Sequence, residues 1–305
     1  MGGVVRKLRG DRDGLPASVH LPSRIGDENS FQWAGQHAGF LGSKYDPLTL
    51  IDENWNPGTL PPTFRPSTDI SPDRFSDRAN LLRGIQKRGL SVVGNGPAEY
   101  ATSQERAVSV LNQSSAWNAF LLDDEKPATI GRYGNHKFGR SCLVARRLVE
   151  AGVGFVTVPW TFVKSVENFD THRNHFRLMK EFLMPAVDQA FSALIEDLAE
   201  RGMLDDTLVA WTGEFGRTPK INKNAGRDHW GNVYSTVLAG GGTRGGQIYG
   251  ASDRNAAEPA EDPVHVGDFV ATIYHALGFD TRTVVHDLTG RPHSVVPGRP
   301  VYSLF

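Results

Sequence analysis

The pattern of apolar positions divides the chain into two parts. Up to about residue 72 the sequence is rich in Gly, Pro, Asn and Asp and shows no sustained period, which predicts irregular structure with turns. Beyond that point, apolar residues recur at helical spacing or in short runs. We therefore expect one domain over 1–305, with a loop-rich segment at 1–72 and an α/β core at 73–305.

Helical spacing recurs in several segments of the core. The pattern predicts helices over 72–89, 97–121, 137–150, 174–200 and 268–277. Pro185 predicts a kink in the helix at 174–200, and Gly202 predicts its C-terminal cap. Asp268 is expected to cap the helix that it opens. Cys142 falls on the apolar face of the helix at 137–150, where a buried small hydrophobe is favoured over a nucleophile.

Short apolar runs between these helices are typical of strands. They read "VGFVTVPW" at 153–160, "DDTLVAWTG" at 205–213 and "YSTVLAGGG" at 234–242. Alternation of strands and helices predicts a mainly parallel sheet with helices on both faces. In such sheets the reactive groups lie beyond the carboxyl ends of the strands.

Polar residues gather after two of these strands. Asp170 and His172 follow the first strand, Glu214 follows the second, and Asp228 and His229 come slightly later. Parallel strands would deliver these loops to one edge of the sheet. Carboxylates suit hard divalent cations, and zinc-like ions also take imidazole. These five residues are therefore predicted to hold one or two divalent ions (zinc, calcium, manganese or magnesium), an arrangement used for ester hydrolysis.

Arg217 and Arg227 flank the predicted ligands. Guanidinium groups match the oxygens of phosphate and sulfate, so these arginines are predicted to bind an anionic ester. Simpler interpretations stay open: the Asp170–His172 pair as a hydrogen-bonded loop, and Glu214 as a cap or a solvated residue. His175 could replace His172 as a ligand, but a place on the polar face of its helix is favoured.

Other features exclude several classes of function. The segment "GGGTRGG" at 240–246 lacks the Lys-Ser/Thr ending of a phosphate-binding loop and is predicted to be a turn. The formal net charge of -1 argues against a sequence-independent grip on nucleic acid or an acidic membrane. One cysteine allows no internal disulfide. No run is long enough to span a bilayer, and "MGGVVRKLRGDRDG" is not a signal peptide, so the chain as written is expected to be cytoplasmic.

Several long strings carry a family resemblance. "NFDTHRNHF", "LMPAVDQAFSALIEDLAERGMLDDTLVAWTGEFGRTPKIN", "GRDHW", "VLAGGGTRGGQIYGASD" and "HVGDFVATIYHALGFD" resemble a bacterial family of sulfatase-like proteins, domain of unknown function 1501. The resemblance is dense from residue 138 onward and loose before it. It implies the alkaline phosphatase superfamily: a three-layer α/β/α sandwich with a mainly parallel central sheet and two metal ions. Asp170, His172, Glu214 and His229 match its ligand pattern, with Asp228 as an additional candidate.

The chain also departs from that superfamily. A strand followed by "GG…S…D", which would supply the nucleophile and the first metal ligand, does not occur before residue 72, and Cys142 is followed by "LVAR" rather than a sulfatase signature. The resemblance therefore implies an N-terminally truncated member that lacks its first strand. Such a chain alone is expected to hydrolyse phosphate or sulfate esters only weakly. The full-length parent is expected to be exported or periplasmic.

We expect a metal-dependent hydrolase of phosphate or sulfate esters. The alternative is a non-catalytic module that binds sulfated glycans. The expected partner is a small anionic ester or a sulfated glycan.

Overall fold

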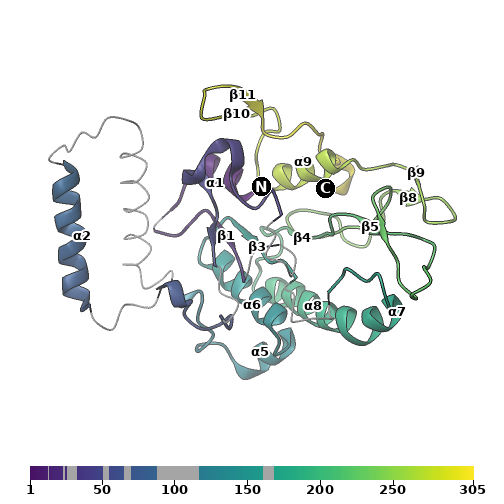
Figure 1. The fold of residues 1–305 in the computed structure, drawn as a ribbon, viewed down its shortest axis with the longest axis horizontal. Coiled ribbons are helices and arrows are strands. Elements are labelled where there is room, and N and C mark those ends of the chain that lie inside the picture. Colours follow the sequence, from purple (N-terminus) through teal and green to yellow (C-terminus); the bar gives the residue numbers. More distant parts are fainter. Residues whose placement is uncertain are drawn as a thin grey trace. The chain divides into compact units, whose positions relative to one another are not determined.

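The computed structural model describes the chain except for residues 13, 23–24, 26–32, 51–54, 65–69, 88–116 and 161–167. The chain divides into two compact units, which are described separately. The first comprises Met1–Ile130 and Leu143–Pro159, and the second comprises Gly131–Cys142 and Trp160–Phe305. Figure 1 shows the elements of both units along the sequence. The single domain expected over 1–305 stays a prediction.

A small parallel sheet organises the first unit. Its strand order is β2 (Leu48–Thr49), β1 (Ser18–His20) and β3 (Phe155–Thr157), and both pairings are parallel. The central strand β1 is buried along its length, as expected for a parallel strand covered on both faces. Helix α1 (Gly2–Arg9) contacts β1 and β3. A Cβ on Gly3 would lie 2.8 Å from Cβ of Ala38, so this close approach requires glycine.

The loop-rich interpretation of residues 1–72 is wrong where these elements lie. Besides α1, β1 and β2, the segment contains the short 3₁₀ helices η1 (Gly39–Leu41), η2 (Ser43–Tyr45) and η3 (Pro62–Phe64). The elements are too short to show a period. The partner of β1 on one side is β3, more than a hundred residues further along, and such a pairing leaves no local signal.

Two predicted helices of the core are confirmed, and a third is not described. Helix α2 spans Pro72–Lys87 and α6 spans Lys137–Glu150. Cys142 on α6 is buried, as predicted. The helix predicted at 97–121 lies mostly outside the described residues. Helix α5 (Pro127–Tyr133) was not predicted.

Buried charges lie along the C-terminal half of α6. The side chain of Arg146 is 0% exposed and its guanidinium donates to Glu125 at 2.6 Å and also to Glu150. Arg147 donates to the same oxygen of Glu125 at 2.6 Å. Burial alone would raise the pKa of Glu125, but the hydrogen bonds from the two arginines outweigh burial and lower it.

The helix predicted at 174–200 forms in three pieces within the second unit (Figure 1). Helix α7 (His175–Leu178) leads into a π-helical turn, η4 (Met179–Leu183), and then into α8 (Met184–Glu200). Pro185 is the second residue of α8. Because proline has no N–H and its ring crowds the preceding turn, the regular hydrogen-bonding pattern changes just before it. Gly202 follows the end of α8 with φ 67°, which confirms the predicted C-terminal cap.

The strands of the second unit pair antiparallel. They form β4 (Val209–Trp211) with β7 (Val237–Ala239), β5 (Gly216–Arg217) with β6 (His229–Trp230), β8 (Ala251–Ser252) with β9 (Pro259–Glu261), and β10 (Val284–His286) with β11 (Pro292–Ser294). The predicted strands at 153–160 and 205–213 therefore belong to different sheets among the described strands, not to one parallel sheet. Over the part of the chain that the structure describes, the fold is mixed α/β, with one small parallel sheet and several small antiparallel ones.

The last predicted helix forms, but its cap differs from the expectation. Helix α9 spans Val266–Ala276, and His265 caps it by accepting a hydrogen bond from the N–H of Gly267. Asp268 instead accepts from the N–H of Arg299 at 2.7 Å, so its predicted role as the cap is wrong. Residues 240–246 form turns after β7, as predicted. Across the described residues, no helix is long and apolar enough to cross a membrane.

Candidate metal centre

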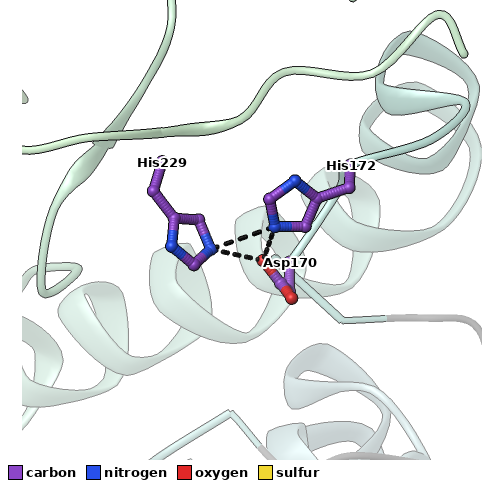
Figure 2. A group of neighbouring side chains, drawn as sticks. All are labelled: Asp170, His172 and His229. Atoms are coloured by element: carbon purple, nitrogen blue, oxygen red, sulfur yellow. Dashed lines mark hydrogen bonds and ion pairs between the residues drawn. The ribbon is translucent and has the colours of Figure 1, made fainter.

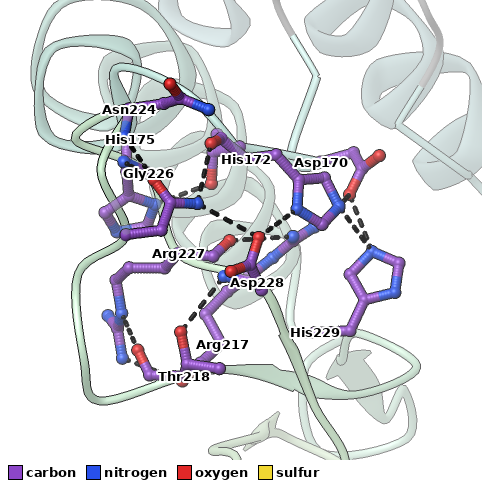
Figure 3. Close-up of polar contacts among 12 residues, drawn as sticks. Asp170, His172, His175, Arg217, Thr218, Asn224, Gly226, Arg227, Asp228 and His229 are labelled. Atoms are coloured by element: carbon purple, nitrogen blue, oxygen red, sulfur yellow. Dashed lines mark hydrogen bonds and ion pairs between the residues drawn. The ribbon is translucent and has the colours of Figure 1, made fainter.

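Two loops of the second unit lie against each other and carry the candidate residues. One loop precedes α7, and the other joins β5 to β6. Backbone hydrogen bonds connect them: Arg227 N to Thr171 O at 3.1 Å, and His175 N to Ala225 O at 2.9 Å. Figure 3 shows how the side chains of the two loops face one another. The two loops are therefore held together by their backbones, independently of any side-chain charge.

Gly226 makes this close approach possible. A Cβ at this position would lie 1.9 Å from the carbonyl oxygen of His172 and 2.5 Å from the backbone nitrogen of Arg173. Any other residue would push the two loops apart. The backbone contact fixes the position of His172 relative to the residues that follow Gly226, which include Asp228 and His229.

Three Lewis bases converge at the junction of the loops (Figure 2). Oδ1 of Asp170 lies 3.0 Å from Nε2 of His172 and 2.9 Å from Nε2 of His229. The two Nε2 atoms are 3.1 Å apart. Ligands about 2.0–2.2 Å from a zinc-like ion at tetrahedral angles are about 3.3–3.5 Å apart, so a small outward shift would admit an ion. The Asp170 and His229 side chains are 51% and 50% exposed, which leaves one side open to solvent.

Asp228 orients His172 from behind the cluster. Its Oδ1 accepts a hydrogen bond from Nδ1 of His172 at 2.6 Å and another from the side-chain amide of Asn222 at 3.1 Å. The hydrogen bond from His172, followed by that from Asn222, lowers the pKa of Asp228. A carboxylate can only accept, so in the neutral ring the proton lies on Nδ1 and the lone pair of Nε2 points at Asp170 and His229. Carboxylate–histidine pairs of this kind support metal ligands in many proteins.

Asp170 is held in its ionised form. Burial alone would raise the pKa of Asp170, but the hydrogen bonds from His229 and from Arg217 outweigh burial and lower it. The Nη2 atom of Arg217 donates to Oδ1 at 2.8 Å. The carboxylate is therefore a charged ligand near neutral pH, and part of its charge is already balanced by the guanidinium.

Glu214 lies near the cluster but outside the group of three. Partial burial raises the pKa of Glu214, and it interacts electrostatically with His229, Asp170 and Arg217. Its side chain is otherwise exposed. The predicted roles of Glu214 and Asp228 as direct metal ligands stay predictions. The geometry gives Asp228 an orienting role.

The two arginines mainly support the loops. Arg227 donates to the carbonyl oxygens of Thr218 at 2.6 Å and of Arg217 at 3.0 Å. Arg217 donates to the carbonyl oxygens of Phe169 at 2.7 Å and of Arg227 at 3.2 Å, besides its bond to Asp170. Their predicted role in binding an anion stays a prediction.

His175 is not on a polar face, so that interpretation is wrong. The residue is 7% exposed, and its Nδ1 is hydrogen-bonded to the buried hydroxyl of Thr171 at 2.6 Å. Burial, followed by the nearby charges of Arg227 and Arg217, lowers the pKa of His175. A neutral, buried His175 anchors the loop between Asp170 and His172.

Sequence reasoning also missed Asn222, in the β5–β6 connection, and Phe215, in the bend before β5; both contact the cluster. Asn222 is one of several turn-type residues in "KINKNAG", and Phe215 is an apolar residue next to a strand. Neither position carries a pattern that would single it out.

The fold and the cluster together define a mixed α/β protein with a candidate site for a divalent ion. The chain belongs to the family described as Protein of unknown function (DUF1501), whose model matches residues 1–305. This match confirms the family to which the sequence strings point. No curated protein and no solved structure matches the chain.

Proposed function

We propose that this protein is a metal-dependent hydrolase of phosphate or sulfate esters, with Asp170, His172 and His229 as ligands of a divalent ion. The observation that carries the proposal is the convergence of three ligand atoms at 2.9–3.1 Å, with the proton of His172 directed away toward Asp228. Two imidazoles and one carboxylate suit zinc better than calcium, magnesium or manganese, which prefer oxygen. Three protein ligands with an open side are typical of catalytic rather than structural zinc sites.

A proton can take the place of the ion in the metal-free protein. If His229 carries its proton on Nε2, that proton serves both Oδ1 of Asp170 and Nε2 of His172. A divalent ion bound at Nε2 would replace this shared proton, which would move to Nδ1 of the same ring, because a ligating imidazole is neutral. The ligand atoms are therefore already close together without the ion, and no large rearrangement is needed to bind it.

The loop beside the cluster favours an anionic substrate. Residues 217–227 contain Arg217, Lys220, Lys223 and Arg227 and no acidic residue. When bound, a divalent ion would act as a Lewis acid that polarises an ester oxygen. The basic loop would draw the negatively charged ester toward the open side of the cluster.

The wider relationship is also part of the proposal. The family resemblance supports a place in the alkaline phosphatase superfamily, with its three-layer α/β/α sandwich and a second ion near Glu214 and Asp228. The hydroxyl of Thr218 is a poor nucleophile here, because it donates to Lys220 O at 2.8 Å and accepts from Asp228 N at 3.1 Å.

Metal binding is tested first. Chelator-treated full chain is titrated with Zn²⁺, Mn²⁺, Ca²⁺ and Mg²⁺ by calorimetry. Asp170→Asn, His172→Ala and His229→Ala should each abolish tight binding. Asp280→Asn and His293→Ala, matched residues with partners elsewhere, should leave binding unchanged. Equal binding by all five variants would refute the centre.

Hydrolysis is tested second, with an aryl phosphate and an aryl sulfate. The hydrolase proposal expects turnover that requires the ion and is lost in Asp170→Asn. Metal binding without turnover, together with retention on a sulfated glycan column, would favour the binding module instead.

A further inference from the structure

An aromatic ring lies against the least supported member of the cluster. The ring of Phe215 is 4.2 Å from the imidazole of His229, centroid to centroid, with 38° between the planes. The guanidinium carbon of Arg217 lies 5.9 Å from the centroid of the same ring. His229 and Arg217 both donate to Oδ1 of Asp170, at 2.9 and 2.8 Å. Phe215 therefore contacts two of the groups that hold this oxygen.

The two histidines of the cluster are supported differently. His172 is fixed by the hydrogen bond from its Nδ1 to Asp228. His229 is hydrogen-bonded through Nε2 only, to Asp170 and His172, and no residue of the described chain accepts from or donates to its Nδ1. Metal-ligating imidazoles usually bond through the second nitrogen to a fixed partner. At His229 the described contact beyond Nε2 is with the ring of Phe215, which lies over the imidazole face rather than in its plane.

The hairpin geometry explains how Phe215 reaches this position. Arg217 on β5 pairs directly with His229 on β6. Phe215 lies in the bend just before β5, and its ring is on the same side as the guanidinium of Arg217, which lies 5.9 Å from the ring centroid. Gly216 between them is tightly held, since a Cβ there would lie 2.3 Å from Val233 O. This backbone contact limits how far Phe215 can move from His229.

We propose that Phe215 is a positioning residue for the metal centre, whose ring face sets the orientation of His229 toward Asp170 and His172. The expected effect of Phe215 on metal affinity rests on the proposed function. The contact between the two rings does not, because it exists without the ion. An aromatic pair prefers offset or tilted stacking, which holds the imidazole plane without engaging Nε2. Nε2 therefore stays available to a proton or an ion.

Cobalt titration of the full chain, followed by its visible absorption, measures the consequence. Phe215→Ala should weaken Co²⁺ binding about 10–100-fold, the usual effect of losing a supporting contact, and should change the absorption band of bound Co²⁺. Phe215→Tyr should keep the wild-type affinity for Co²⁺ and the wild-type absorption band, and Phe215→Leu should lose them. Phe182→Ala, a truncation on η4, is the control and should match the unmodified protein. Wild-type affinity and spectrum in Phe215→Ala or Phe215→Leu would overturn the proposal.

A second measurement needs no ion. In the metal-free protein, the stacked ring of Phe215 should shift the imidazole proton resonances of His229 by its ring current. Phe215→Leu should remove the shift, and Phe215→Tyr should keep it. Resonances of His229 that are the same in all three proteins would overturn the proposal even if no Co²⁺ binds. If the unmodified chain binds no Co²⁺ but shows the shift, the result would count against the proposed metal centre and not against the orienting role of Phe215.

Discussion

Nδ1 of His172 donates a hydrogen bond to Oδ1 of Asp228 at 2.6 Å, which leaves Nε2 of the same ring facing Asp170 and His229. This relationship separates two roles that look alike in the sequence "GRDHW". His229 contributes a nitrogen to the cluster, whereas Asp228 acts through His172. The distinction gives the two neighbours different expected effects when they are replaced.

Asp228→Asn should weaken metal binding without removing a ligand. The amide no longer requires a proton on Nδ1 of His172, so the ring can present an N–H at Nε2 instead of a lone pair. Such supporting changes usually cost about 10–100-fold in metal affinity. Zn²⁺ calorimetry measures the loss, and Asp280→Asn is the control. A larger loss than that of His229→Ala would instead mean that Asp228 binds the ion directly.

Gly226→Ala should separate the two loops. The new methyl group would occupy space 1.9 Å from the carbonyl oxygen of His172, and a backbone atom cannot move aside as a flexible side chain can. We expect lost metal binding and a lower melting temperature. Gly231→Ala is the matched control, because a Cβ at Gly231 would meet nothing within 4 Å. Equal behaviour of the two variants would show that the loops are not held together at Gly226.

Glu125→Ala should strongly destabilise the first unit. It leaves the guanidinium of Arg146, 0% exposed, without the carboxylate that accepts from it at 2.6 Å. Removing one partner of a buried ion pair costs about 3–5 kcal/mol, and we expect the lower end here because Glu150 still accepts from Arg146. Urea unfolding measures the loss. Glu181→Ala, whose partner Arg177 is 70% exposed, is the control and should cost less than about 1 kcal/mol.

The pKa of Glu125 sets the pH range of this stabilisation. Its folded pKa is lowered, so the contribution is fully present above the unfolded value of about 4.3 and is lost as pH falls through the folded value. The difference between the wild-type protein and Glu125→Gln should therefore shrink in acid. A difference that grows as pH falls would contradict this assignment.

Cys142 should be unreactive in the folded protein. Burial raises the pKa of its thiol to about 12, and the thiolate is the reactive form. At pH 8 a thiol reagent should modify the native chain far more slowly than the same chain in denaturant. Rapid native modification would show that α6 opens readily around this residue.

Sequence patterns identified most residues of the cluster correctly, but the predicted reason for their proximity was wrong. Asp170, His172, Asp228 and His229 do lie together, but not because two parallel strands deliver them to one edge. Strands β3 and β4 belong to different sheets. The loops meet through backbone hydrogen bonds and the absence of a side chain at Gly226, and neither leaves a periodic signal. Polar residues next to glycines indicated where the site lies in the sequence. The pairing of the strands could not be predicted from local sequence patterns.

Long helices could be predicted from the sequence, whereas short strands and short helices could not. Helices such as α6 and α8 carry several turns of apolar spacing, so their existence and approximate ends follow from the sequence. The strands are only two or three residues long, which is too short for alternation to show. Similarly, His265 rather than Asp268 caps α9, because the helix begins at Val266 and Asp268 already lies inside it, where it accepts from the N–H of Arg299, 31 residues away.

A bound ion should raise the stability of the second unit, since an ion that binds only the folded protein shifts the folding equilibrium toward it. At about 100 times its dissociation constant, one ion adds about 2.7 kcal/mol to the free energy of unfolding. Melting curves with Zn²⁺ and with chelator should therefore differ. Asp170→Asn should melt at the same temperature in both conditions, because the ion loses its charged ligand. His293→Ala should keep the full difference. A stabilisation by Zn²⁺ that survives in Asp170→Asn would place the ion elsewhere on the protein and refute the assignment of the cluster as the metal centre.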